Sequence, residues 1–328
     1  MILIVVFSYN RAMQLDFLLK SIFARFSGED FIIKIIYHTT GNHKYGYRML
    51  KIKYQEDNRI TFCERESHYF GLFSYLPTLY SWVNLKRFIK YSILFNEGSD
   101  NFKKLLESIV KKTNCKYVIF NTDDGFYYDD VKVPLDILSS IERNPLHTSY
   151  RLYVGENLEG FPKYIRKYLG HHYKWDYYFT NMITHWTFPF SVDGTIYHAR
   201  TILSILSKVS YHNPTTLEHN VVRYVMKRKL LKEGISPKTS KLVCTKLNRV
   251  AKDSSNPSIN INNDYLNEKF LEGFELEIEL PKLITNANLV PSKVNVVNGN
   301  QKITVYNYDA NGMLVQSLLG IEGVKSMD

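Results

Sequence analysis

Residues 116–126 read KYVIFNTDDGF, and this stretch decides the predicted fold. Residues suited to a buried strand run directly into two adjacent carboxylates, Asp123 and Asp124, and then a glycine. A strand that ends in carboxylates places negative charge at one edge of a sheet, which is where open α/β sheets bind their ligands. Adjacent carboxylates at such an edge are typical ligands of a hard divalent cation, which can in turn hold phosphates. Asp-Asp-Gly is also good turn chemistry, so this stretch alone leaves both interpretations open.

The N-terminal part of the chain alternates between strand and helix patterns. Residues 2–7 form a short, continuous apolar run, which is typical of a parallel strand covered on both faces. A helical pattern extends from Met13 to Ile22, and strand patterns follow at 31–37 and 59–63. Strand, helix and strand at this spacing indicate βαβ units. The predicted fold class is therefore α/β, with a Rossmann-like, mostly parallel central sheet flanked by helices.

The rest of the chain is predicted to continue this architecture. Helices are expected at 75–95, 102–112, 131–144, 199–209 and 211–231, strands at 186–190, 194–198 and 241–245, and a loop at 38–46. Beyond Pro281 the chain is rich in Asn and has alternating apolar residues, which is a strand pattern. We therefore expect a main domain over residues 1–280 and a small β-rich or extended C-terminal appendage over 281–328.

The charge of the chain is high and unevenly distributed. The whole sequence has 42 Lys and Arg against 32 Asp and Glu, a net charge of +10. Residues 261–328 hold nine acidic and five basic side chains, a net of −4, so residues 1–260 carry +14. A basic main domain suits an anionic partner such as nucleotide phosphates, a lipid-phosphate surface or nucleic acid. No nucleic-acid-binding motif is visible and the basic residues are dispersed, so nucleic acid is not the expected partner.

The cysteine count and the hydropathy pattern indicate where in the cell the protein is located. Three cysteines follow no metal-ligand spacing, which favours a reduced, intracellular protein. Residues 2–7 lack the basic start of a secretory signal, and no apolar run is long enough to span a membrane. The expected location is cytoplasmic. The basic side chains Lys86, Arg87 and Lys90 leave open a peripheral contact with the inner face of an anionic membrane, although the solvated face of a core helix is the favoured explanation.

Four short motifs, taken in order, carry a resemblance to a known family. They are Ser8-Tyr9-Asn10-Arg11 after the first strand, Asn121-Thr122-Asp123-Asp124 after the central strand, Leu217-Glu218 at a helix start, and Leu247-Asn248-Arg249-Val250 in a late loop. Together they resemble the GT-A-fold, nucleotide-sugar-dependent glycosyltransferases, and the chain is similar to the inverting family 2 of bacterial surface-polysaccharide type. The resemblance spans about residues 1–280.

The resemblance implies an activity and a set of site residues. A sugar would move from a nucleotide-diphosphate-sugar donor to the hydroxyl of a glycan or lipid-linked acceptor, with inversion and with Mg²⁺ or Mn²⁺ held by Asp123 and Asp124. The implied donor-binding residues are Ser8, Tyr9, Asn10, Arg11, Thr39, Asn121, Thr122, Asp123, Asp124 and Arg249. The chain departs from the family where Asn121 replaces an aspartate, where no acid follows the second strand, and where His219 replaces a second acid.

Two residues are candidates for the catalytic base that takes the proton of the acceptor hydroxyl. Glu218 is the first choice and Asp193 the second. Thr215 and Glu218 also have the spacing of a helix capping box, which by itself explains a glutamate at that position. Two other protein classes stay open: a metal-dependent nucleotidyl or phosphoryl transferase, and a non-enzymatic, basic nucleic-acid-binding protein.

Overall fold

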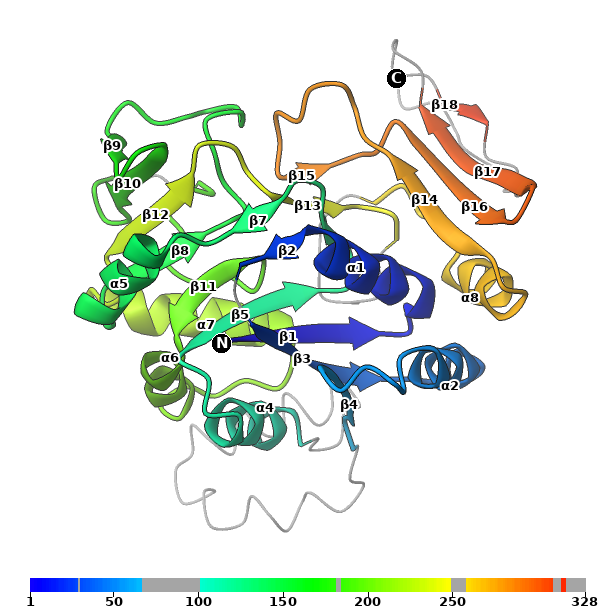
Figure 1. The fold of residues 1–328 in the computed structure, drawn as a ribbon, viewed down its shortest axis with the longest axis horizontal. Coiled ribbons are helices and arrows are strands. Elements are labelled where there is room, and N and C mark those ends of the chain that lie inside the picture. Colours follow the sequence, from blue (N-terminus) through cyan, green and yellow to red (C-terminus); the bar gives the residue numbers. More distant parts are fainter. Residues whose placement is uncertain (29, 67–100, 181–183, 249–257, 309–313, 317–328) are drawn as a thin grey trace, which may run out of the picture.

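A nine-stranded sheet lies at the centre of the protein, with the strand order β4-β3-β1-β5-β11-β8-β12-β10-β9 (Figure 1). The computed structural model describes residues 1–28, 30–66, 101–180, 184–248, 258–308 and 314–316. The nine strands are β1 (Ile2–Tyr9), β3 (Phe31–His38), β4 (Ile60–Glu64), β5 (Tyr117–Thr122), β8 (Thr148–Arg151), β9 (Arg166–Tyr168), β10 (His172–Asp176), β11 (Thr195–His198) and β12 (Glu233–Pro237). Only β10 and β11 run against the others, so seven of the nine strands share one direction. The predicted α/β class with a mostly parallel central sheet is confirmed.

The apolar run at the N-terminus is buried on both faces of this sheet. Ile2, Ile4 and Val6 belong to one hydrophobic cluster and Leu3 and Val5 to the other, and all five are fully buried. Successive side chains of a strand point to opposite faces, so a strand covered on both sides has no polar positions. This burial explains why the strand appears in the sequence as a continuous apolar run.

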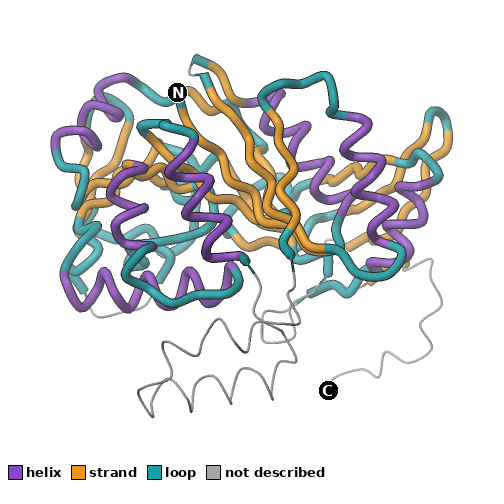
Figure 2. The backbone as a smooth tube through the Cα atoms, turned by 90° about the horizontal axis from the view of Figure 1, so that it is seen from below, coloured by secondary structure: helices purple, strands orange, loops and turns teal. Residues whose placement is uncertain are grey.

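Helices cover both faces of the sheet, as Figure 2 shows from below. Helices α1 (Ala12–Arg25), α2 (His43–Lys53), α5 (Leu135–Arg143) and α8 (Asn263–Leu271) pack on the face of Ile4, and α4 (Phe102–Lys112), α6 (Ala199–Leu206) and α7 (Pro214–Arg228) on the face of Val5. Within the described residues, no helix has the length and apolar character needed to cross a membrane.

Three smaller sheets are also present in the part of the chain that the structure describes. They consist of β6 (Gly125–Tyr127), β13 (Leu242–Thr245) and β15 (Asn288–Leu289), of β2 (Phe26–Ser27) and β7 (Val131–Lys132), and of β14 (Glu275–Glu279), β16 (Lys293–Asn298), β17 (Gln301–Tyr308) and β18 (Leu314–Gln316). The four-stranded sheet lies beside α8 at one end of the molecule (Figure 1) and begins with β14, before residue 281. Strand β15 returns to pair with β13, so the C-terminal segment also contacts the main domain. The division at residue 280 stays a prediction.

Several local predictions differ from the structure. Residues 43–46 belong to α2 rather than to a loop, because Gly46 allows α2 to pack closely against Ala12 of α1. The helix predicted over 131–144 begins only at Leu135, because 131–132 pair in β7. The strand predicted at 186–190 is wrong: these residues form an irregular segment, and the Phe188 carbonyl accepts a hydrogen bond from Arg151. The helix predicted at 75–95 lies outside the described residues.

A buried glycine joins two irregular segments beside the sheet. A Cβ atom added to Gly155 would lie 2.2 Å from the backbone nitrogen of Ser240. We expect Gly155→Ala to lower the free energy of unfolding by about 1–3 kcal/mol, because backbone atoms must shift to relieve the overlap. Urea unfolding measures this change. Ser139→Ala, on the exposed side of α5, is the control; an equal loss in both variants would contradict this packing.

Candidate active site

The ends of β1 and β5 bring two of the sequence motifs together. The two strands are parallel neighbours, with Phe7 opposite Thr122, so the residues that follow them meet at one edge of the sheet. Oδ2 of Asp123 accepts hydrogen bonds from Ser8 Oγ at 2.8 Å and from the Tyr9 backbone N–H at 3.0 Å. The Ser8–Arg11 turn and Asp123 are therefore in direct contact.

Arg11 forms a buried ion pair at this edge. Its Nη1 donates to Asp123 Oδ1 at 2.9 Å and lies 3.5 Å from Asp124 Oδ2, and its Nη2 donates to the Asn248 carbonyl at 2.6 Å. The side chains of Arg11 and Asp123 are only 7% and 5% exposed. Burial lowers the pKa of Arg11, but the charges of Asp123 and Asp124 outweigh it and raise that pKa overall. The guanidinium is therefore charged and fixed between the two carboxylates.

The other side chains of the Asn121–Asp124 motif point to different partners. Asn121 is buried, and its Oδ1 accepts a hydrogen bond from the Tyr127 hydroxyl at 2.8 Å. Thr122 Oγ1 donates to Asp193 Oδ1 at 2.8 Å. Asp124 is 34% exposed and keeps a carboxylate at the surface of the site. The motif therefore leaves Asp124 partly exposed, and its other members form hydrogen bonds within the protein.

Asp193 and Glu218 form a pair of carboxyl groups with raised pKa values. Asp193 precedes β11, and Glu218 accepts a hydrogen bond on Oε1 from the Val192 backbone N–H at 3.1 Å. Burial, then the negative charges of Glu218 and Asp124, raises the pKa of Asp193 to about 7. Burial also raises the pKa of Glu218, against the opposing effects of Val192 N–H and Arg151. A carboxyl group that titrates near neutral pH can act as a general base.

Glu218 does not cap its helix. The side chain of Asn213 accepts from the Thr216 backbone N–H at 2.8 Å, and Thr216 Oγ1 accepts from the Asn213 backbone N–H at 3.1 Å. This reciprocal pair is the capping box of α7, and Pro214 occupies the first turn. The capping explanation for Glu218 is therefore wrong, because another residue pair performs that role.

A basic pocket lies at the carboxyl ends of β3 and β4. It has a volume of about 360 Å³ and is lined by Tyr37, Thr39, Gly41, Lys44, Tyr47, Arg48, Lys51 and Glu64. Three cationic side chains of α2 face one carboxylate, so the pocket favours an anion. Thr39, a predicted donor-binding residue, lies on this pocket. Asn10 holds the adjacent loop by two hydrogen bonds with Thr40.

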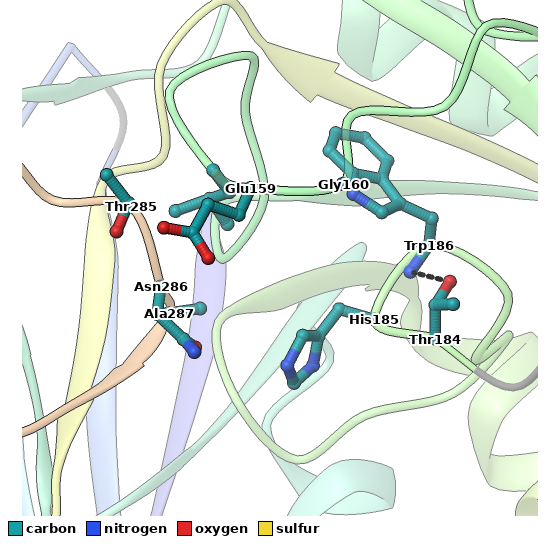
Figure 3. A pocket seen from close by; sticks show the side chains of 9 residues that line it. Glu159, Gly160, Thr184, His185, Trp186, Thr285, Asn286 and Ala287 are labelled. Carbon is teal, nitrogen blue, oxygen red and sulfur yellow. Dashed lines mark hydrogen bonds between the residues drawn. The ribbon is translucent and has the colours of Figure 1, made fainter.

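A second, smaller pocket lies between three irregular segments of the chain. Its volume is about 130 Å³, and Figure 3 shows its lining residues, which are Leu158, Glu159, Gly160, Thr184, His185, Trp186, Thr285, Asn286 and Ala287. The ring of His185 packs edge-on against Tyr153 at 5.5 Å. Burial raises the pKa of Tyr153, and the charges of Cys244, Asp193 and Glu218 add to the effect.

Sequence reasoning missed several side chains around the pair. Arg151 lies close enough to affect the pKa of both Asp193 and Glu218, and together with burial it lowers the pKa of His185. Arg151 ends β8, a strand without a clear apolar pattern. The only hint of these side chains in the sequence is that residues 148–198 are rich in basic and aromatic residues. This composition does not indicate which side chains reach the site. Arg249 lies outside the described residues, and its neighbour Asn248 is at the site through the bond to Arg11.

The side chains at the end of β5 do not fit the metal centre that the resemblance implies. Both oxygens of Asp123 accept hydrogen bonds from Ser8, Tyr9 and Arg11, and the oxygen of Asn121 accepts one from Tyr127. Asp124 is left as a single carboxylate, beside a guanidinium. Over the part of the chain that the structure describes, no group of three or more His, Cys, Asp or Glu side chains is arranged to hold a metal ion.

Comparison with known proteins returns glycosyltransferase structures. The 1–349 fragment of S. aureus TarS in complex with UDP-GlcNAc matches at 11% identity with a TM-score of 0.42, over 82% of this chain and 65% of that one. A second crystal structure of the same fragment matches at 11% identity with a TM-score of 0.43, over 75% of this chain and 60% of that one. A mannosyltransferase from Pyrobaculum calidifontis, in complex with GDP-Man and Mn²⁺, matches at 13% identity with a TM-score of 0.28, over 48% of this chain and 36% of that one.

These similarities are distant. The chain spans less than two thirds of the length of each matched structure. A scan against protein-family models finds no match, and neither does a search of curated protein sequences. The functional assignment below is therefore argued from the residues of this chain.

Proposed function

We propose that this chain is a glycosyltransferase that moves a sugar, with inversion, from a nucleotide-diphosphate-sugar to a hydroxyl of a glycan or lipid-linked saccharide. One observation carries the proposal: Asp193 accepts a hydrogen bond from Thr122 at the carboxyl end of β5, and burial with the charges of Glu218 and Asp124 raises its pKa to about 7. That end of the strands is where α/β sheets bind ligands. A titratable carboxyl group and a basic pocket at the same edge of the sheet are what transfer from an anionic donor to a hydroxyl requires.

Asp193 is the proposed proton acceptor. Its pKa is raised to about 7 by burial and by the charges of Glu218 and Asp124. Thr122 holds Asp193 by a hydrogen bond at the end of β5, and Val192 holds Glu218 in the first part of α7. As the acceptor oxygen forms its bond to the anomeric carbon, the bond from that carbon to the diphosphate breaks, and the hydroxyl proton passes to Asp193. Glu218 raises the basicity of Asp193 by its negative charge. This assignment reverses the order of the two candidates that the sequence favoured.

The two pockets suit the two substrates. Lys44, Arg48 and Lys51 offer positive charge to the donor in the pocket that Thr39 borders. The smaller pocket is about the size of a cavity that holds one six-membered ring. Its lining includes Glu159, His185 and Asn286, whose polar atoms can bond to sugar hydroxyls (Figure 3). We place the donor in the first pocket and the acceptor ring in the second.

A cytoplasmic location with a peripheral membrane contact is part of the proposal. A lipid-linked acceptor in surface-polysaccharide synthesis is presented at the membrane surface. The net charge of +10 favours contact with an anionic leaflet. Sedimentation with vesicles that contain anionic lipid, compared with neutral vesicles, measures this contact.

Thermal unfolding in the presence of UDP-, GDP-, dTDP- and CMP-linked sugars tests the proposed activity. We expect one nucleotide sugar to raise the unfolding temperature, because a ligand that binds only the folded state stabilises it. Incubation with that donor should release the nucleoside diphosphate. Release of pyrophosphate would indicate a nucleotidyl transferase instead, and stabilisation only by oligonucleotides would indicate a nucleic-acid-binding protein.

A further inference from the structure

A guanidinium lies where the sequence motif predicts a divalent cation. Arg11 Nη1 contacts Asp123 Oδ1 at 2.9 Å and Asp124 Oδ2 at 3.5 Å, so one positive group is shared by the two carboxylates. We infer that Arg11 takes the place of the metal ion at this edge of the sheet, and that the chain binds its nucleotide without a divalent cation. The second part of this inference rests on the proposed function; the first does not.

The hydrogen bonds around Asp123 make this arrangement hard to exchange for a metal. Ser8 Oγ and the Tyr9 backbone N–H both bond to Oδ2, and Arg11 occupies Oδ1. The Tyr47 hydroxyl contacts Ser8 Oγ and accepts from the Arg11 backbone N–H at 3.3 Å, which fixes both donors from the side of α2. A metal on Asp123 would have to displace these donors. It would also leave the guanidinium buried beside a like charge, which is strongly unfavourable.

Two further contacts oppose a rearrangement that would admit the metal. Arg11 Nη2 donates to the Asn248 carbonyl at 2.6 Å, so a second segment of the chain holds the guanidinium in place. Asn121, the one other motif residue with an oxygen suited to a cation, is turned away and accepts from Tyr127. Asp124 is then the only motif carboxylate left for a cation, and one exposed carboxylate does not bind Mg²⁺ or Mn²⁺ tightly.

Arg11 also changes the charge that a diphosphate meets. Asp123 and Asp124 together carry −2, and the guanidinium reduces this to −1 at the surface where the phosphates would lie. The cations of the adjacent pocket, Lys44, Arg48 and Lys51, add positive charge. Internal cations can thus neutralise part of the diphosphate charge, which is the electrostatic role that a bound metal ion otherwise has.

Calorimetric titration of the nucleotide-free protein with Mn²⁺ tests the first part. We expect no binding by the wild type at millimolar Mn²⁺. Arg11→Met frees Oδ1 of Asp123 and Oδ2 of Asp124 and is expected to gain Mn²⁺ binding. Arg25→Met, which removes a surface partner of Asp130, should not gain it. Mn²⁺ binding by the free wild type with one-to-one stoichiometry would overturn the inference. If Arg11→Met does not fold, the wild-type titration still decides it.

Thermal unfolding with the nucleotide sugars in EDTA, and again with Mn²⁺, tests the second part. We expect the same rise in unfolding temperature in both conditions. A rise that occurs only with Mn²⁺ would overturn the metal-free binding. If no nucleotide sugar stabilises the protein in either condition, the proposed function fails, and the Mn²⁺ titration continues to decide what Arg11 does.

Discussion

Asp193→Asn is expected to lower the rate of sugar transfer by about 10²–10⁴-fold, the usual contribution of a general base. The amide cannot accept the proton of the acceptor hydroxyl at neutral pH. Its Oδ1 can still accept the hydrogen bond from Thr122 Oγ1, so the local structure should be retained. Donor binding, measured by thermal unfolding with the nucleotide sugar, should be unchanged. Transfer within a few fold of the wild-type rate would remove Asp193 from this role.

The stability of the same variant should depend on pH in a defined direction. The pKa of Asp193 is raised to about 7 in the folded protein from its ordinary value of 3.8. The stability that this group contributes is therefore fully present below its unfolded pKa and is lost as the pH rises through its folded pKa. Asparagine is neutral throughout. Asp193→Asn should thus be more stable than the wild type at about pH 8 and lose this advantage toward about pH 4.

Glu218→Gln is the matched partner of this experiment. In the wild type, kcat/KM should rise with pH through about 7, because the base must be deprotonated. Removing the charge of Glu218 lowers the pKa of Asp193, so the rise should move to lower pH and transfer should survive. A loss in Glu218→Gln as deep as that in Asp193→Asn, without this displacement, would instead make Glu218 the base, as the sequence first suggested.

Strands that are buried on both faces of the sheet could be predicted from the sequence. Residues 2–7 and 117–120 are continuous apolar runs because helices cover both faces of the sheet at those strands. The strand β8 and the start of α2 gave no such signal. They include polar residues such as Arg151 and His43, which are buried only because other segments pack around them. Tertiary contacts decide these elements, and periodicity in one segment does not carry that information.

The location of the candidate site could be predicted from the sequence, but the hydrogen bonds and ion pairs within it could not. The sequence places Ser8–Arg11 and Asp123 at the same edge of the sheet, because parallel neighbouring strands end together. It cannot indicate that Arg11 reaches Asp123 rather than solvent, or that Asn121 turns to Tyr127. Glu218 illustrates the same limit: two spacings fit a capping box, and the local competition between Asn213 and Thr215 is settled only in three dimensions.

Asp123→Ala is expected to lower the free energy of unfolding by about 3–5 kcal/mol, the cost of breaking a buried ion pair by removing one partner. The Arg11 guanidinium would stay buried without its main counter-charge, and Ser8 Oγ and the Tyr9 N–H would lose their acceptor. Urea unfolding measures this loss. Asp130→Ala breaks the exposed pair with Arg25 and should change stability by about 0–1 kcal/mol.

A second substitution separates the charge from the packing in this result. If the loss in Asp123→Ala comes mainly from the unpaired guanidinium, adding Arg11→Met should restore part of it, because the double variant no longer buries a lone charge. If the loss of stability comes from the cavity and from the unsatisfied Ser8 and Tyr9 donors, the losses caused by the two substitutions should add. Recovery of stability in the double variant would mean that the ion pair is kept for what it does at the site, since apolar residues could replace it without cost to the fold.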